Sequence, residues 1–300
     1  MNEDGTATTE DGIIYKVVAG TVHIVGCTED VTELNIPEQL PPPGMDDPEP
    51  EDMVPVTYIA AEAFYGNQNL TSVTLPESLV AIGASSFCAC TSLKNIVIPD
   101  SCGSINADAF CMSGLESVKL PASLYFVGDE VFAYCTSLKE VTIPGNLSQV
   151  GTTMFSNCTN LRKVTMEEGV QSVGSNAFYS CSSLETVEFP TTMQRIMANA
   201  FSYCGLTSMD MPDTINSIAS GAFSHCQNLK SIKLSKGLTS IRKDTFSYCG
   251  LESIEIPDNI TSIKSGTFSY CSDLKSVTLP DTLTELADVA FYSCTSLESC

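Results

Sequence analysis

Residues 274–291 read LKSVTLPDTLTELADVAF, and this pattern decides the fold because it recurs along most of the chain. The phenylalanine that ends it is the last of eleven that follow one another at intervals of 22 or 23 residues. They are Phe64, Phe87, Phe110, Phe132, Phe155, Phe178, Phe201, Phe223, Phe246, Phe268 and Phe291. A constant period of this length is typical of arrays in which each repeat packs only against its neighbours.

Proline and cysteine keep the same register as phenylalanine. One proline column comprises Pro76, Pro99, Pro121, Pro144, Pro190, Pro212, Pro257 and Pro280, with Glu167 and Ser235 in its place twice. Three residues after phenylalanine stand Cys90, Cys135, Cys158, Cys181, Cys204, Cys226, Cys249, Cys271 and Cys294, with Asn67 and Ser113 as exceptions. The interval shortens to 22 only where Gly114, Gly205 or Gly250 replaces two residues, which predicts a tight turn at that point.

Each repeat predicts two extended segments and a turn. Its consensus is L-x-x-V/I-x-L/I-P-x-x-L/I-x-x-I-x-x-x-A-F-x-x-C-x-x. The L-x-x-V-x-L part alternates and is rich in Val, Ile and Thr, which is typical of a strand. Proline ends the strand because it cannot donate to a ladder, and a second extended piece follows, such as residues 238–241. We expect the A-F-x-x-C part to turn the chain back as one helical or 3₁₀ turn. Stacked repeats then share an apolar core that no single repeat could form.

This spacing, with its L-x-x-V-x-L-P strand and A-F-x-x-C turn, resembles the BspA-type leucine-rich repeat, also called the Treponema pallidum type. The resemblance covers residues 31–300. It implies a mostly β leucine-rich-repeat solenoid, a right-handed coil with a parallel sheet and about eleven rungs. Family members are mostly surface or secreted proteins of host-associated microbes, implicated in adhesion to host matrix proteins and to other cells. The resemblance therefore implies an extracellular or cell-surface location, but the repeat template carries no information on the ligand.

The two ends of the chain depart from the repeat. Residues 13–25, IIYKVVAGTVHIV, read as a β-hairpin around Ala19 and Gly20. We therefore expect residues 1–30 to be a tail and capping hairpin for a repeat domain over residues 31–300. Residues 297–300 stop in mid-strand, with Cys300 in the Val/Ile column. We expect the native protein to continue beyond this point, or a neighbour to cover this end.

An acidic, proline-rich insert interrupts the first rung. The rung begins at Val31, is broken by residues 41–55 and resumes at Val56. Calcium binding is conceivable for the acidic side chains of the insert, which are Asp46, Asp47, Glu49, Glu51 and Asp52. Their spacing fits no known calcium loop, so we interpret the insert as a solvated linker.

The charge of the chain argues against a nucleic-acid partner. Its 36 acidic and 14 basic residues give a net charge of −22, and such a chain repels phosphate backbones. The start, MNEDGTATTE, shows no signal peptide, and no apolar run approaches the ~18 residues of a membrane helix, so no membrane span is expected. Both a processed or cloned piece of a secreted protein and a cytosolic protein are compatible with this start.

The fourteen cysteines admit three interpretations. In the favoured one, the cysteine column is buried and each thiol acts as a small apolar group with a weak donor. The second is disulfide bonding, for which the parallel side chains of the column are poorly placed. Cys88 and Cys111, one rung apart and outside the column, are the best candidates for such a bond. The third is zinc, but there is no C-x₂-C pair and the regular spacing is the period of the fold itself.

No constellation of residues indicates catalysis. His23 falls in the predicted hairpin, where we expect it to face solvent, and His225 shares a repeat column with tyrosines. Neither histidine has a nucleophile and an acid placed around it outside the repeat template. Acidic pairs such as Asp129 and Glu130 lie at predicted turns, and no glycine-rich phosphate loop occurs. We therefore predict no enzyme, no catalytic or cofactor-binding residue, no cofactor and no metal site.

Two columns are candidate partner-binding surfaces. The first x of L-x-x-V-x-L holds Thr71, Lys94, Glu116, Lys139, Arg162, Glu185, Thr207, Lys230, Glu252, Lys275 and Glu298. Their charges mostly alternate in sign from one rung to the next. This favours a self-satisfying charge ladder, in which neighbouring side chains pair with one another, over a face for protein recognition, and both interpretations remain open. The second column, two residues after phenylalanine, holds Tyr203, His225, Tyr248 and Tyr270, which could contact a partner or stack between rungs.

The predicted function is that of a non-enzymatic surface or secreted binding module. It would serve adhesion through protein–protein contacts on the solenoid face, with host matrix or another cell surface as the partner. The alternative is a passive structural spacer or a targeting region for another domain.

Overall fold

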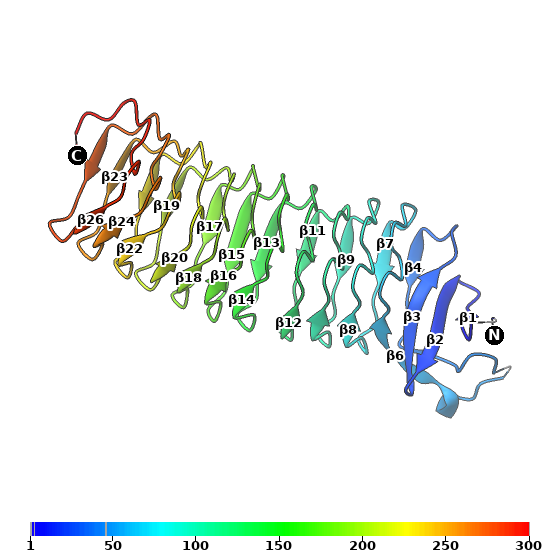
Figure 1. Cartoon of the computed structure of the whole chain (residues 1–300). Coiled ribbons are helices and arrows are strands. Elements are labelled where there is room, and N and C mark those ends of the chain that lie inside the picture. The colour runs from blue at the N-terminus through cyan, green and yellow to red at the C-terminus, as the bar shows by residue number, and fades with distance from the viewer. Residues whose placement is uncertain (1, 3, 46, 300) are drawn as a thin grey trace. The chain divides into compact units, whose positions relative to one another are not determined.

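The computed structural model describes residue 2, residues 4–45 and residues 47–299 (Figure 1). The chain divides into two compact units, Met1–Leu138 and Lys139–Cys300. Each unit is a stack of short parallel strands, which confirms the predicted β-solenoid, and the one helix among the described residues is the 3₁₀ turn η1 (Pro50–Asp52). The predictions for Asp46 and Cys300 fall outside the described residues.

The first unit contains two sheets, one from each extended segment of the repeat. The larger has the order β1-β2-β3-β6-β8-β10-β12, with β5 pairing with β6, and the smaller has the order β11-β9-β7-β4. The strands of the larger sheet are β1 (Ala7–Thr8), β2 (Ile13–Val18), β3 (Thr21–Cys27), β5 (Gln39–Leu40), β6 (Val54–Ile59), β8 (Ala81–Ile82), β10 (Ser104–Ile105) and β12 (Phe126–Val127). Those of the smaller sheet are β4 (Glu33–Asn35), β7 (Ser72–Thr74), β9 (Asn95–Val97) and β11 (Ser117–Lys119).

Strands β2 and β3 form an antiparallel hairpin at the N-terminal end of the larger sheet. Ala19 and Gly20 both have positive φ, of +51° and +82°, as the tight two-residue turn of a hairpin requires. Strand β3 then pairs in parallel with β6, so the hairpin continues the stack of rungs. His23 lies on the face of β3 opposite to the buried Val22 and Ile24, as expected for a solvent-facing strand residue, and its half-buried ring lies 4.8 Å from that of Tyr58.

The acidic insert is partly ordered by its own backbone. Strands β5 and β6 pair antiparallel across it, with Gln39 opposite Pro55, and η1 lies between them. The Asp52 carboxylate accepts a hydrogen bond from the Glu49 N–H (3.0 Å), and the Tyr15 hydroxyl donates to the Pro41 carbonyl (3.0 Å). The insert is thus an ordered loop between two paired strands.

The second unit repeats the two-sheet arrangement. The L-x-x-V-x-L segments form three ladders: β13 (Glu140–Ile143), β15 (Lys163–Met166) and β17 (Thr186–Glu188); β19 (Ser208–Asp210) and β21 (Ser231–Lys233); β23 (Ser253–Glu255) and β25 (Ser276–Thr278). The second extended segments form two ladders. The first comprises β14 (Gln149–Val150), β16 (Ser172–Val173), β18 (Arg195–Ile196) and β20 (Ser217–Ile218). The second comprises β22 (Ser240–Ile241), β24 (Ser262–Ile263) and β26 (Glu285–Leu286). Val164 faces Val141 on one side and Val187 on the other, so equivalent positions of successive rungs stand in register.

The phenylalanine column forms the centre of both units. The rings of nine of its members are completely buried, and within each unit neighbouring rings stack nearly in parallel with centroids 4.9–5.6 Å apart. Phe178, for example, lies between Phe155 (5.5 Å) and Phe201 (5.3 Å). Each ring is thus covered by the rungs on its two sides, so its burial depends on the interfaces between neighbouring repeats.

The A-F-x-x-C segment is a run of hydrogen-bonded turns, so the predicted helical or 3₁₀ turn is wrong. The Cys181 N–H donates within the rung to the Phe178 carbonyl (3.2 Å), but the Phe178 N–H donates to Ala200 in the next rung (2.9 Å). Local and inter-rung bonds alternate in this way because Asn176 and Ser180 adopt left-handed backbone, with φ of +54° and +58°. A helix would keep its N–H groups within one rung, whereas this conformation ties each rung to the next.

The cysteine column is a ladder of buried donors, which confirms the favoured interpretation. The Cys181 Sγ donates to the Phe155 carbonyl of the preceding rung at 3.1 Å. The same bond at the same distance is made by Cys90, Cys135, Cys204, Cys226, Cys249, Cys271 and Cys294. Burial raises the pKa of Cys90 and Cys181 to about 12, so these thiols stay protonated.

All thirteen cysteines among the described residues are free thiols. Cys88 and Cys111 lie together in a small buried cluster with Ala133 and do not form the disulfide considered for them. Their positions reflect packing at the turn between rungs, where a small side chain is accommodated.

Removing one central ring tests the stack. We expect Phe178→Ala to lower the free energy of unfolding by about 3–5 kcal/mol, because the cavity it leaves is enclosed by the rungs on both sides. Urea unfolding followed by circular dichroism measures this loss. The control is Phe126→Ala, at a phenylalanine outside the column that is 48% exposed, for which we expect a change of about 0.5 kcal/mol. Equal losses in the two variants would show that the column is not the core.

Alkaline pH should destabilise the fold through the cysteine ladder. The thiol of Cys181 ionises near its ordinary pKa of 9.0 when unfolded but at about 12 when folded. The unfolded chain therefore binds fewer protons above pH 9, and the contribution of this thiol is complete below pH 9 and lost between pH 9 and 12. Within that window each such thiol lowers the free energy of unfolding by up to about 1.4 kcal/mol per pH unit.

Urea midpoints under reducing conditions at pH 7, 9 and 10.5 measure this dependence. Cys181→Ala is the matched control, since tyrosine and lysine titrate in the same range and are unchanged in it. We expect a shallower loss of stability with pH in the variant than in the parent protein. The same slope in both would exclude the thiol as its cause.

Candidate binding surfaces

The charged column lies on the outer side of the L-x-x-V-x-L strands. In the second unit its members are joined rung to rung through their backbones: the Arg162 N–H donates to the Lys139 carbonyl (2.8 Å) and the Glu185 N–H to that of Arg162 (3.0 Å). Equivalent side chains therefore project one above another. Among the column residues Glu116 is half-buried, and the other charged members, including Lys94, are exposed.

One ion pair of the second unit joins a member of the charged column to a residue outside it. The Lys230 Nζ lies 2.8 Å from the Asp273 carboxylate, two rungs away, and this pairing raises the pKa of Lys230 and lowers that of Asp273. Among the described residues of this unit, no ion pair joins Glu252 to Lys230 or to Lys275. Lys230 and Glu252 therefore do not pair with each other along the column, and both side chains are exposed.

Four rings of the second unit form a continuous stack on the surface, which we call the aromatic ladder: Tyr203, His225, Tyr248 and Tyr270. Neighbouring ring centroids are 4.3–4.4 Å apart and the ring planes are within 8° of parallel. The stack ends where Tyr179 and Tyr292 meet it edge-on, each at 5.4 Å. The structure thus brings together the three tyrosines that the sequence singled out.

The backbone under the aromatic ladder explains its geometry. All four residues have left-handed backbone, with φ between +58° and +63°. Each also donates its N–H to a carbonyl of the next rung, as Tyr203 does to Ser224 (2.9 Å) and Tyr248 to Ser269 (2.8 Å). Non-glycine residues seldom adopt positive φ, so nothing in the amino-acid types predicted this conformation. The repeated inter-rung bond holds it and sets the side chains one above another.

A hollow of about 510 Å³ runs beside the aromatic ladder. Its wall carries the polar groups of Asn199, Ser220 and Asp244. His225, Tyr248 and Tyr270 of the ladder also line this hollow, and the flat faces of these stacked rings cover one another. Burial between its neighbours lowers the pKa of His225, which favours the neutral imidazole.

No metal-binding cluster is found in the part of the chain that the structure describes. No three His, Cys, Asp or Glu side chains of these residues converge as metal ligands do. The helices of the described part include none long and apolar enough to cross a bilayer.

The repeat is a known one. The family model for the BspA type leucine rich repeat region matches overlapping segments at residues 57–185, 103–213, 148–275 and 194–300. The chain belongs to the BspA-type leucine-rich-repeat family. Its charged column and aromatic ladder therefore lie on the surface of a BspA-type repeat domain.

Solved structures share the BspA-type architecture of this chain. A leucine-rich repeat protein from Bacteroides ovatus is 22% identical with a TM-score of 0.62, covering 97% of this chain and 93% of its own. A leucine rich cell surface protein from Faecalibacterium prausnitzii is 27% identical with a TM-score of 0.53, covering 98% and 93%. A leucine-rich repeat protein from Eubacterium ventriosum is 16% identical with a TM-score of 0.51, covering 96% and 94%. No functionally curated protein shows significant similarity to the chain.

Proposed function

We propose that this chain is a non-enzymatic adhesion module that acts at a cell surface or after secretion, and that its partner is a protein of the host matrix or of another cell. The partner contacts the aromatic ladder and the charged column of the solenoid. The observation that carries the proposal is the aromatic ladder itself, an ordered strip of aromatic side chains that remains exposed to solvent.

The exposure of the aromatic ladder suits it to protein recognition. Tyr203, Tyr248 and Tyr270 are each about 40% exposed, although the apolar side chains of the repeat core are buried. Tyrosine is enriched at interfaces and at the residues that dominate binding energy, because one side chain offers both apolar area and a hydrogen-bonding group. The rings are already held by stacking, so a partner does not have to immobilise them, and less conformational entropy is lost on binding.

The family supports the class of function and its location. Leucine-rich-repeat solenoids present long surfaces from a rigid core, which is an architecture for contacting other macromolecules. The relative from F. prausnitzii, 27% identical over nearly the whole chain, is a cell surface protein. The charged column adds a second, polar surface, whose side chains give specificity and faster association with an oppositely patterned partner.

Removing the ladder tyrosines tests the proposal. We expect the triple variant Tyr203→Ser, Tyr248→Ser and Tyr270→Ser to weaken binding to extracellular-matrix proteins or to intact host cells at least tenfold, since losing a single interface hot spot costs about 2 kcal/mol or more. Surface plasmon resonance against a panel of purified matrix proteins, and cell binding by flow cytometry, measure it. The matched control replaces three exposed tyrosines of the first unit, Tyr65, Tyr125 and Tyr134, with serine. Equal effects of the two triple variants would contradict a role for the ladder.

Reversing the charged column tests the second surface. We expect changing Lys94, Lys139, Arg162, Lys230 and Lys275 to glutamate to slow association and reduce its salt dependence. The control changes Lys16, Lys119, Lys233, Lys236 and Lys243 to glutamate, which gives a protein with the same net charge as the column variant. If the parent protein binds none of the matrix proteins or cells, the adhesion proposal fails and the chain is a passive spacer.

A further inference from the structure

The smaller sheet of the first unit ends at an open strand. Its order is β11-β9-β7-β4, so β4 has a ladder partner on the β7 side only. The N-terminal hairpin continues the larger sheet, where β3 pairs with β6, and leaves the edge of β4 uncovered. An open edge presents unpaired N–H and C=O groups that can pair with another extended chain.

The backbone bonds show which groups of β4 are free. The Thr71 N–H donates to the Thr32 carbonyl (2.7 Å), and the Ile36 N–H donates to the Thr74 carbonyl (3.1 Å). Even-numbered residues of this segment therefore face β7, and Glu33 and Asn35 direct their N–H and C=O groups to the other side. Within the residues that the structure describes, these four groups have no backbone partner.

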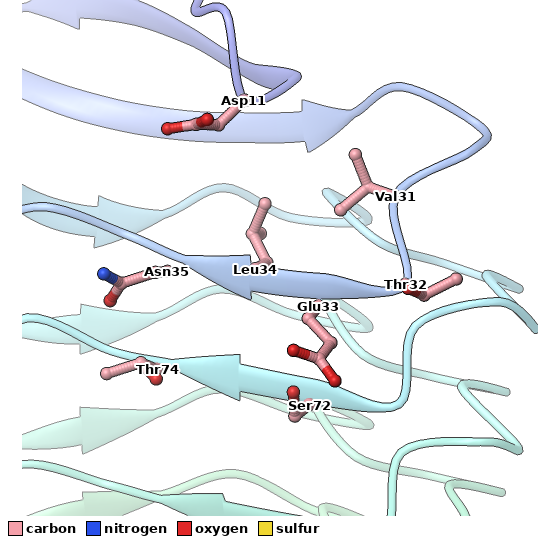
Figure 2. A pocket seen from close by; sticks show the side chains of 8 residues that line it. All are labelled: Asp11, Val31, Thr32, Glu33, Leu34, Asn35, Ser72 and Thr74. Atoms are coloured by element: carbon pink, nitrogen blue, oxygen red, sulfur yellow. The ribbon is translucent and has the colours of Figure 1, made fainter.

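A hollow of about 520 Å³ lies along this edge. Figure 2 shows Asp11 and Val31 on the side of β4 that is away from β7. The turn that carries Asp11 is held in place, because the Thr28 N–H donates to the Gly12 carbonyl (2.9 Å). Gly12 has φ of +82°, and a Cβ there would lie 2.5 Å from the Thr28 hydroxyl, so only glycine allows this close approach.

The charge around the edge selects the kind of strand that fits. Asp11 and Glu33 line the hollow and are exposed. Residues 1–55 contain 13 acidic residues and a single base, Lys16. A cationic segment is complementary to this surface, whereas a second copy of this chain, with a net charge of −22, is repelled.

We propose that the β4 edge binds an extended basic peptide segment of a partner protein by strand addition. The backbone of the peptide pairs with the N–H and C=O groups of Glu33 and Asn35. Side chains alternate across the added strand, so the residues beside Glu33 and Asn35 lie on the solvent face. The residue beside the buried Leu34 lies on the inner face. The edge is thus complementary to a sequence in which Lys or Arg alternates with an apolar residue.

This site is independent of the aromatic ladder, which belongs to the second unit. The probe is a fluorescent hexapeptide, Lys-Val-Lys-Val-Lys-Val, whose binding to the full chain is followed by anisotropy at low and at physiological salt. We expect saturable binding that weakens with salt. The control peptides Lys-Lys-Lys-Val-Val-Val and Glu-Val-Glu-Val-Glu-Val should each bind with an affinity more than tenfold lower.

Two substitutions test the geometry. Asn35→Pro removes an outward N–H while leaving the β7 ladder intact, since proline is tolerated on an edge whose N–H faces solvent. We expect at least tenfold weaker binding of the probe, and Asn35→Ala, which keeps the N–H, to bind within twofold of the parent. Glu33→Lys should also weaken binding at least tenfold, and Asp129→Lys, the same charge change at another exposed residue of this unit, should not.

Hydrogen–deuterium exchange on the unmodified protein gives a readout that does not depend on how the variants fold. We expect the probe to slow exchange within residues 32–36. Unchanged exchange there, or equal binding by the Asn35→Pro and Asn35→Ala proteins in folded form, would overturn the proposal. The tyrosine variant of the aromatic ladder should bind the probe normally, so failure of this site and failure of the proposed adhesion surface are distinguishable.

Discussion

The stability of this protein depends on contact between successive rungs, because no rung can bury its own phenylalanine. Phe178 is completely buried only because Phe155 and Phe201 stack on its two faces. The thiol of Cys181 is likewise paired through the Phe155 carbonyl of the rung before it. Each rung therefore supplies the partner for the next, and the free energy of folding resides in interfaces between repeats rather than within them.

The same constraint shapes the surface. Alternating local and inter-rung hydrogen bonds require left-handed backbone at Tyr203, His225, Tyr248 and Tyr270. That conformation brings the side chains within stacking distance on the outside of the solenoid. The inter-rung hydrogen bonds that satisfy the backbone groups thus also produce an ordered aromatic strip. The same left-handed backbone occurs in rungs whose side chain at this position is small, such as Ser180.

A stack of rungs has ends, and the ends are where its bonding is incomplete. At the N-terminal end the hairpin of β2 and β3 continues one sheet, but β4 retains an open edge beside an acidic hollow. In the core, burial keeps thiols such as Cys181 protonated, which lowers their nucleophilicity. The surfaces that we propose for recognition are therefore made of exposed side chains and unpaired backbone groups.

The sequence by itself determined the period, the family, the buried phenylalanine and cysteine columns and the residues of both candidate surfaces, because these follow from which residue types recur at a fixed spacing. It did not determine the conformation of the A-F-x-x-C turn, where the bond between Phe178 and Ala200 replaces a helical one. Nor did it determine that Lys230 pairs with Asp273 instead of Glu252, or that β4 keeps a free edge. Those features were decided by tertiary structure, since they depend on how far a side chain or an N–H reaches into a neighbouring rung, and that distance exists only after the rungs have stacked.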